Sequence, residues 1–493
     1  KPYEFNHLFD SLSLILKFNF TLAGEVYFQS RMQPSAYYNE SLRTVPLYRT
    51  LGGFSPNFTA EQTIQTLEHT MHDNLNANII PVSQGYLAIS DLQGGNLLDK
   101  VTLSFMGNQS HQSPIMTSTH DGWLEYNYIT STHPLSHPKY PDIIYNFDAI
   151  IRVHPIDPLA IKYEYRFYTW DRRDWLDLNK TVFYTLPANK LSYVHSFSLT
   201  NEYIIFFEYP MFWDIPAMFI HTSILPTIYW DPTVNTRIHV IDIRTGTLAM
   251  QLDTEPVFAF HHINAFYIPM NSSQSIQSPP SVGDNLFKRQ RRRHPTIQSL
   301  LERAQPFPSQ CLDTGLKPQG LQYENGEFTV DILTYPNGSI FGDFYLAGLR
   351  RGGPHTSKYP AGRVMRFSWN FDSTRVSWRI LSDRMMELPA IDPLDRGRPY
   401  RYFYAVGNDY AIYRVDLITG AIRGWSTAGH YPSEPVFIPP RYLASVTLDT
   451  GRNKSYLLLL DSDTMDPLST TSNNFLWLDT WIPLTCHGNW IST

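Results

Sequence analysis

The sequence predicts an all-β fold, and a β-propeller in preference to a sandwich. Proline (36 residues) and aromatic side chains (14%) are abundant among the 493 residues, while apolar runs with helical periodicity are scarce. Short runs of β-branched and aromatic residues alternate with turn-forming residues, which is typical of many short strands. The third observation is a repeated arrangement of strand, aspartate, turn and strand, the pattern of propeller blades.

The repeated arrangement occurs twice clearly and once more loosely. Each copy has an apolar run that ends at an aspartate (Asp242, Asp416 or Asp461), and in the two clear copies a Thr-Gly pair follows as a tight turn. The spacing between copies is irregular, so a sandwich stays open as the alternative. The three segments are RIHVIDIRTGTLAMQL (237–252), AIYRVDLITGAIRGWS (411–426) and YLLLLDSDTMDPLSTT (456–471).

Length, charge and cysteine content restrict the class of protein. Length alone suggests two or three domains, but a single all-β domain over residues 1–493 is the exception that this length permits. The net charge of −6 is small for this size, so we expect no nucleic-acid partner. Two cysteines, Cys311 and Cys486, cannot form a disulfide framework or a cysteine-rich zinc site.

Two segments interrupt the strand pattern. Residues 269–320 are rich in Ser, Pro and Gln, which predicts an inserted mobile loop, and carry the basic run KRQRRR (288–293). We interpret that run as solvated surface, with a protease-sensitive dibasic site as the alternative. The apolar segment 209–230 is broken by Pro210, Asp214 and other polar residues or prolines, so it cannot span a membrane. It is either a partly buried loop or a surface patch that contacts a membrane or gathers a lipophilic substrate.

The compartment is weakly indicated. Eight N-x-S/T sequons exceed the roughly four that chance would give, which favours a secretory route and a glycoprotein. Cytoplasmic and membrane-associated locations remain alternatives. The chain begins at Lys1 without the pattern of a signal peptide, which is either absent or already removed. The sequons are at Asn19, Asn39, Asn57, Asn108, Asn179, Asn271, Asn337 and Asn453.

Four of the seventeen histidines stand in similar surroundings. Each follows or lies within an apolar run and is followed by a turn-forming residue or a polar anchor, as a metal ligand at the inner end of a strand would be. From spacing alone, a histidine satisfied by hydrogen bonds in the core is the competing interpretation. The four contexts are STHP at His133, YVHSFSLT at His195, FAFHHINAF at His261, and LTCHGNW at His487.

At these histidines the sequence resembles the carotenoid cleavage oxygenase family, which includes carotenoid and apocarotenoid dioxygenases, stilbenoid-cleaving dioxygenases and the retinoid isomerase. Eight motifs occur in the order of the family, so the resemblance covers nearly the whole chain. The motifs are HLFDS (7–11), GEVYFQSR (24–31), STHP (131–134), VHSFSLT (194–200), FHHINA (260–265), ENGEFTVDILTYPNGS (324–339), YPSEPVF (431–437) and HG (487–488).

The resemblance implies a seven-bladed β-propeller with a dome of loops over an axial site, where four histidines hold Fe(2+). The matched ligands are His133, His195, His261 and His487, and His262 is assigned to the core. His137 is a rival to His133, which we prefer because it follows Ser-Thr.

The family also uses three acidic residues to accept the second ring N–H of a ligand. Glu434 and Glu387 match two of them, and the third position falls on Asp91, where a glutamate is usual. A shorter side chain must then reach the histidine, or a water must intervene.

The implied activity is the cleavage of one C=C bond by dioxygen to give two carbonyl products, with no catalytic residue beyond the iron centre. Stilbenoid-cleaving relatives place a lysine where this chain has Ser90, so we predict a carotenoid or apocarotenoid substrate. The alternatives are a stilbenoid-cleaving dioxygenase, a non-oxidative isomerase and a non-catalytic lipophile-binding propeller. Cys486, where relatives often have Phe, could widen the pocket or expose a thiol to oxidants.

Overall fold

The structure is a computed structural model, and over the residues that it describes the chain is all-β, as the sequence predicts. The chain divides into two compact units. The first comprises Lys1–Ile15, Ser30–Phe260 and Thr334–Ala361, and the second comprises Leu16–Gln29, His261–Leu333 and Gly362–Thr493. The described residues are 4–21, 25–43, 54–55, 73–92, 94–108, 116–157, 160–173, 180–218, 221, 223–270, 311–312, 324–349, 362–468, 476–482 and 485–491.

The first unit has three antiparallel sheets in which most strands pair with their neighbours in sequence. They are β5 (Asn78–Pro81), β6 (Gly85–Ile89), β7 (Asn96–Asp99) and β8 (Phe105–Asn108); β9 (Met116–Ser118), β10 (Leu124–Thr130), β11 (Leu135–Ser136), β12 (Ile143–Val153), β13 (Ile161–Asp171) and β14 (Thr181–Ala188); and β15 (Ser198–Leu199), β16 (Tyr203–Glu208), β19 (Thr236–Asp242) and β20 (Thr247–Thr254).

Short elements connect or flank these sheets. Their brevity leaves the sheets as the main structure of the unit. The elements are the strand pairs β1 (Glu4–Phe5) with β4 (Phe54–Ser55) and β17 (Met211–Trp213) with β18 (Ile228–Trp230), the α-helices α1 (Ala36–Ser41), α3 (Ile215–Met218), α5 (Ile340–Asp343) and α6 (Leu346–Leu349), and the 3-10 helices η1 (Leu8–Asp10) and η3 (Leu225–Thr227).

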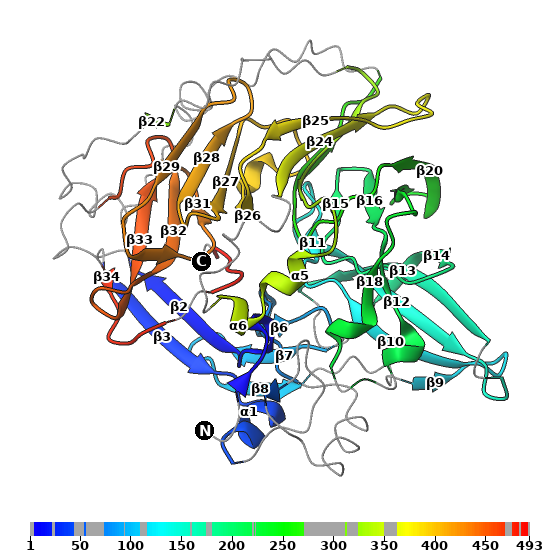
Figure 1. Ribbon diagram of the computed structural model, residues 1–493, viewed down its shortest axis with the longest axis horizontal. Helices are drawn as coiled ribbons and strands as arrows, with labels where there is room; N and C mark the ends of the chain where they lie inside the picture. The colour runs from blue at the N-terminus through cyan, green and yellow to red at the C-terminus, as the bar shows by residue number, and fades with distance from the viewer. Residues whose placement is uncertain are drawn as a thin grey trace. The chain divides into compact units, whose positions relative to one another are not determined.

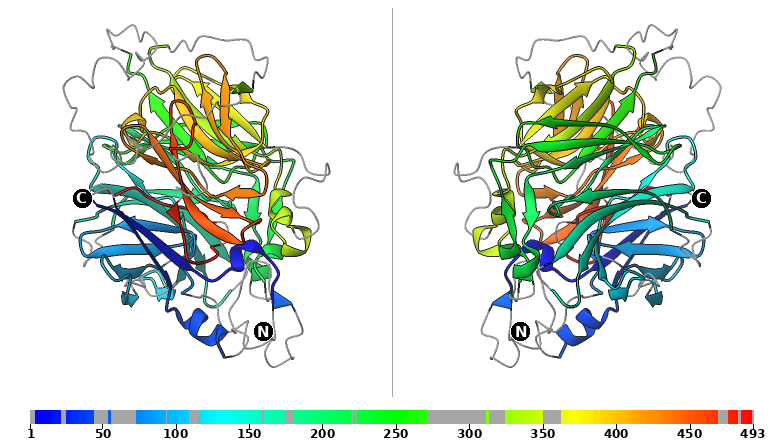
Figure 2. Two further views of the ribbon diagram at one scale, coloured as in Figure 1. Left: turned by 90° about the vertical axis from the view of Figure 1, so that its left-hand side faces the viewer. Right: turned by 90° about the vertical axis from the view of Figure 1, so that its right-hand side faces the viewer.

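The second unit also has three antiparallel sheets, whose strands run side by side in Figures 1 and 2. The 3-10 helix η5 (Pro393–Asp395) lies between two of their strands in the chain. The sheets are β21 (His262–Tyr267), β23 (Phe328–Thr334), β24 (Arg363–Trp369) and β25 (Ser377–Ser382); β22 (Cys311–Leu312), β26 (Met386–Ala390), β27 (Tyr402–Gly407), β28 (Ile412–Asp416) and β29 (Ile422–Trp425); and β30 (His430–Pro432), β31 (Val436–Ile438), β32 (Tyr442–Asp449), β33 (Lys454–Asp461) and β34 (Leu476–Trp477).

These sheets make a β-propeller of six blades, so the predicted number of seven is wrong. Apart from the two short strand pairs of the first unit, the described chain has one further pair, β2 (Leu14–Phe20) with β3 (Val26–Met32). Two strands are too few for a four-stranded blade. Phe18, Phe20 and Val26 of this pair instead pack on the apolar cluster around Tyr442 and Leu457, which belongs to the blade of β30–β34. Their apolar side chains are therefore partly buried without a blade of their own.

The repeated aspartates have a clear structural role. Asp242 ends β19, and its Oδ1 accepts the backbone N–H groups of Arg244 and Thr245 at 2.8 and 3.1 Å. Asp416 does the same at the end of β28, and Asp461 at the end of β33. Because the carboxylate satisfies the backbone donors of the turn, the chain can reverse tightly into the next strand. Gly246 and Gly420 complete the two clear copies with φ of +65° and +71°.

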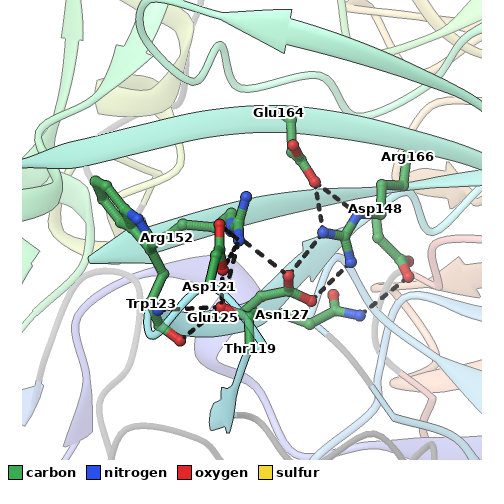
Figure 3. Close-up of polar contacts among 9 residues, drawn as sticks. All are labelled: Thr119, Asp121, Trp123, Glu125, Asn127, Asp148, Arg152, Glu164 and Arg166. Carbon is green, nitrogen blue, oxygen red and sulfur yellow. Dashed lines mark hydrogen bonds and ion pairs between the residues drawn. The ribbon is translucent and has the colours of Figure 1, made fainter. Parts of the chain in front are cut away.

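A charged network covers part of the sheet of β9–β14 (Figure 3). Arg166 on β13 binds Glu125 on β10 through two parallel bonds of 2.7 Å, and its Nε donates to Glu164 at 2.7 Å. Nearer the β9 end, Arg152 donates to both carboxylate oxygens of Asp121. The paired charges join three strands across the sheet and each cation has a carboxylate partner, so the network is structural.

The two segments that interrupt the strand pattern have different outcomes. In 209–230 the side chains of Met211, Phe212 and Trp213 are buried, whereas Tyr229 is 38% exposed. Most of its described apolar surface therefore faces the protein, and membrane contact stays a prediction. The predicted loop at 269–320, with KRQRRR, lies outside the described residues except at its beginning and at Cys311–Leu312. None of the described helices is long and apolar enough to cross a membrane.

Candidate metal centre

His133 and His195 form a pair in the first unit. Their Nε2 atoms are 3.1 Å apart, and their ring planes are inclined at 71°. His133 lies in the loop between β10 and β11, and the buried His195 lies just before β15. Two nitrogens bound to one ion at about 2.1 Å and at right angles are about 3 Å apart, so this spacing suits adjacent ligands of a single metal.

Ser131 ties the backbones of this pair together. Its Oγ donates to the carbonyl oxygen of His195 at 2.6 Å and accepts the backbone N–H of His133 at 3.0 Å. Asn146 on β12 donates to the carbonyl oxygen of Ser131 at 2.9 Å. Ser131 and Asn146 are buried, so water competes little with these bonds, and the two imidazoles are held in place.

The carboxylate of Asp91 reaches His195 directly, without a bridging water. Its Oδ2 is 2.8 Å from Nδ1 of His195, and its Oδ1 accepts the backbone N–H of Thr132 at 3.1 Å. The hydroxyl of Tyr193 donates to the same Oδ2 at 2.8 Å. Burial and the Asp91 charge raise the pKa of Tyr193 well above its usual range, so the phenol keeps its proton.

His261 and His487 form a second pair, in the second unit. Their Nε2 atoms are 3.3 Å apart, and their ring planes are inclined at 70°. His261 is buried and immediately precedes β21, where its carbonyl oxygen accepts the backbone N–H of Leu333 on β23. His487 lies in the C-terminal segment after β34. The spacing again suits two adjacent ligands of one ion.

Each histidine of the second pair meets a predicted carboxylate. Oε2 of Glu387 is 2.5 Å from Nδ1 of His261, and Oε1 of Glu434 is 2.9 Å from Nδ1 of His487. The backbone N–H of Gly488 donates to the other oxygen of Glu434 at 2.7 Å. A carboxylate on Nδ1 keeps the proton on that nitrogen and leaves the Nε2 lone pair for a metal.

His137 and His262, the two neighbouring histidines that were not chosen as ligands, have other surroundings. Nε2 of His137 is 3.1 Å from the carbonyl oxygen of Asn201, and its Nδ1 accepts the backbone N–H groups of Lys139 and Tyr140. Both of its ring nitrogens thus make hydrogen bonds to backbone groups. Loss of hydration and the neighbouring His261 lower the pKa of His262 to about 3, so that ring is neutral. Neither histidine belongs to the two pairs.

Sequence reasoning assigned no role to Ser131, Tyr193 and Asn146. The first two stand inside the STHP and YVHSF motifs and could have been found as polar residues beside predicted ligands. Asn146 has no such signal, because it is distant in sequence. Cys486 carries a free thiol that is exposed, as the second of its two predicted consequences requires.

The fold and these residues define the class of protein: an all-β propeller whose loops carry histidines backed by carboxylates. The four paired histidines are the described residues that could hold a metal ion. Residues 1–492 match the model of a family described as retinal pigment epithelial membrane protein (RPE65). The chain therefore belongs to this family of carotenoid oxygenases, as the motifs predicted.

Curated relatives and solved structures agree with this assignment. The mitochondrial carotenoid-cleaving dioxygenase of Macaca fascicularis is 24% identical, over 99% of this chain and 86% of that protein. The carotenoid isomerooxygenase of Galleria mellonella is 22% identical, over 88% of this chain and 76% of that protein. The structure of cobalt-substituted apocarotenoid oxygenase from Synechocystis has a TM-score of 0.69 at 19% identity, covering 99% of this chain and 89% of that one. The structural likeness supports the fold.

Proposed function

We propose that this chain is a non-haem Fe(II) dioxygenase that cleaves one C=C bond of a carotenoid or apocarotenoid to give two carbonyl products. In this proposal His133, His195, His261 and His487 bind the iron together. The observation that carries it is the common geometry of the two pairs, in which neighbouring Nε2 atoms lie 3.1 and 3.3 Å apart. The names of the relatives, a carotenoid-cleaving dioxygenase and a carotenoid isomerooxygenase, support the reaction class.

The donor set fits ferrous iron. Neutral imidazoles are suitable ligands for Fe(II), but four of them leave the charge of the ion uncompensated. Asp91, Glu387 and Glu434 each accept a ring N–H and so place negative charge one residue away from the metal. Bound iron would supply the activation of dioxygen that oxidative C=C cleavage needs.

The remaining residues orient the ligands and exclude water. The three carboxylates fix the tautomers of His195, His261 and His487, so no ligand needs to lose a proton when iron binds. Beside His195 the ring of Phe260 packs edge-on with a centroid distance of 5.6 Å, and Phe341 packs on Phe260 at 5.1 Å. An apolar, aromatic environment of this kind suits a polyene better than a polar substrate.

The alternatives differ in substrate and in the use of dioxygen. Ser90 is buried, and its Oγ accepts the backbone N–H of Leu92, so this position offers no cation for the phenol of a stilbenoid. A non-oxidative isomerase would yield a single product without consuming dioxygen. Membrane contact through residues 209–230 belongs to this proposal as a route by which a polyene enters. The compartment stays open, although one relative carries a mitochondrial name.

The test is the incubation of iron-loaded protein with a panel of carotenoids, apocarotenoids and stilbenoids under isotopically labelled dioxygen. Mass spectrometry should find two labelled carbonyl products from a carotenoid or apocarotenoid. His195→Ala should abolish iron binding and turnover and leave a folded β protein. His137→Ala is the matched control, because the described hydrogen bonds of its ring are to backbone groups, those of Lys139, Tyr140 and Asn201. Freshly purified protein that binds no iron, or a His195→Ala variant that stays active, contradicts the proposal.

A further inference from the structure

Asp91 differs from the other two carboxylates of the candidate centre. It has the shortest side chain, and a neighbouring side-chain hydroxyl donates to it. Tyr193 donates to Oδ2 at 2.8 Å, the same atom that lies 2.8 Å from Nδ1 of His195. The Tyr193 hydroxyl and the His195 ring nitrogen are themselves 3.4 Å apart, so both donors converge on one oxygen.

The position of Tyr193 is rigidly determined. Its backbone N–H donates to the carbonyl oxygen of Met211, which fixes it beside β17. Its ring, 5% exposed, packs on Phe341 at 5.1 Å and on Trp213 at 5.5 Å between centroids. Because a hydrogen bond holds the backbone and aromatic packing holds the ring, the side chain loses little further conformational freedom when its hydroxyl donates to a carboxylate.

We infer that Tyr193 is a positioning residue of the metal centre, which clamps the short Asp91 side chain so that the carboxylate holds the His195 ring. The inference rests on the proposed function, because it assigns Tyr193 a part in metal binding. A carboxylate turns about its Cβ–Cγ bond, and the backbone N–H of Thr132 restrains only Oδ1. The hydroxyl of Tyr193 restrains the other oxygen, the one that meets the imidazole.

The expected size of the effect follows from its distance to the metal. Loss of a direct hydrogen-bond partner of a ligand costs typically 10–100-fold in metal affinity. Tyr193 acts one bond further out, so we expect Tyr193→Phe to weaken binding about 3- to 10-fold, below that range. The phenylalanine ring keeps the aromatic packing, so the fold should be retained.

The experiment uses the full chain and Co(II) as the probe, because Co(II) reports its ligands through visible absorption. Tyr193→Phe should raise the Co(II) dissociation constant about 3- to 10-fold and change the absorption spectrum. The matched control is Tyr400→Phe. Tyr400 is 1% exposed and donates to buried Asp331 at 2.7 Å, but Asp331 pairs with Arg366 and not with a histidine. Tyr400→Phe should therefore leave Co(II) affinity and spectrum unchanged.

A double-mutant cycle separates a role through Asp91 from a general loss of packing. If Tyr193 acts through Asp91, Tyr193→Phe should have no further effect on Co(II) affinity in the Asp91→Ala background. Asp91→Asn is the second variant and should also weaken binding, because it removes the charge that both donors meet.

The possible failures are distinguishable. If the wild-type chain binds Co(II) and His195→Ala does not, but Tyr193→Phe binds as tightly as wild type, the inference is overturned and the proposed function stands. An equal loss of affinity with and without Asp91 also overturns the inference. If wild type and His195→Ala both fail to bind Co(II) and Fe(II), the proposed function and the inference are overturned together.

Discussion

The buried ion pair of Asp331 and Arg366 provides a test of what holds together the blade of β21, β23, β24 and β25. Nε and Nη2 of Arg366 on β24 each donate to one carboxylate oxygen of Asp331 on β23 at 2.7 Å. The two side chains are 0% and 3% exposed, and the hydroxyl of Tyr400 donates to Asp331 at 2.7 Å. The pair is therefore dry, bidentate and further satisfied by a third donor.

The expected magnitudes depend on whether one partner or both are removed. Asp331→Asn or Arg366→Met leaves a buried charge without its counter-ion, which costs about 3–5 kcal/mol of unfolding free energy. Tyr400→Phe should cost about 1.5–3 kcal/mol, the value of a hydrogen bond to a charged group. The double variant Asp331→Leu/Arg366→Met removes both charges and fills the space, so its cost should fall to about 1–3 kcal/mol, which is the cost of leaving the buried Tyr400 hydroxyl without Asp331 as its acceptor.

Equilibrium urea unfolding of the full chain, followed by far-UV circular dichroism, measures these differences, and hydrogen exchange localises them to β23 and β24. The predicted signature is strong non-additivity, in which the double variant is more stable than either single variant. Two single variants that each cost less than about 1 kcal/mol, or a double variant whose loss equals their sum, would refute the idea that charge burial dominates here.

Three further predictions follow from the described contacts. Glu125→Ala breaks the bidentate bond to Arg166 (Figure 3) and should lower the unfolding free energy by about 1–3 kcal/mol. Arg237→Ala is the comparison: it breaks an exposed pair with Asp253 and should lower the unfolding free energy by less than about 1 kcal/mol. Equal urea midpoints for the two variants would contradict this prediction. The side chain of Asn264 donates to the carbonyl oxygens of Asp395 and Arg398 and accepts the backbone N–H of Gly397. Asn264→Ala removes these three hydrogen bonds, so hydrogen exchange of the amides of residues 395–398 should accelerate. Unchanged protection of these amides would show that other contacts hold this loop. Loss of hydration and the neighbouring Asp392 raise the pKa of Asp395 to about 6. The protonated carboxyl therefore adds to the free energy of unfolding at a pH below the pKa of the unfolded state, and this stabilisation is lost as the pH rises through 6. Asp395→Asn should accordingly raise the urea midpoint near pH 7.5 and leave it unchanged near pH 4, and a rise at both pH values would exclude this cause.

Much of the centre could be predicted because its chemistry is carried by side chains in short motifs. The Nε2 atom of each predicted histidine lies beside the Nε2 atom of another predicted histidine. Each of the three predicted carboxylates lies within hydrogen-bond distance of the Nδ1 atom of a histidine. Of the two candidates His133 and His137, His133 lies beside a second histidine in the described contacts, and its role as a ligand stays a prediction. Whether the four bind iron is a prediction that geometry supports and chemistry must test.

The number of blades could not be predicted in the same way. A strand pattern in the sequence does not show whether further strands join β2 and β3 in a sheet. That depends on where their apolar side chains are buried, and Phe18 and Phe20 pack on the blade of β30–β34. The family resemblance implied seven blades, and it carried no information on this packing.

The hydrogen bonds that orient the three carboxylates could not be predicted either, because their donors are backbone N–H groups, which have no sequence signature. Glu387 accepts the N–H of Leu388 at 3.1 Å, Glu434 that of Gly488 at 2.7 Å, and Asp91 that of Thr132 at 3.1 Å. Gly488 and Thr132 adjoin the predicted ligands His487 and His133, so the same short segments that carry an imidazole also orient a carboxylate. Hydrogen bonds of this kind keep the carboxylates aimed at the rings. Main-chain geometry thus orients these three carboxylates together with their own side chains, the aspartate as well as the two glutamates.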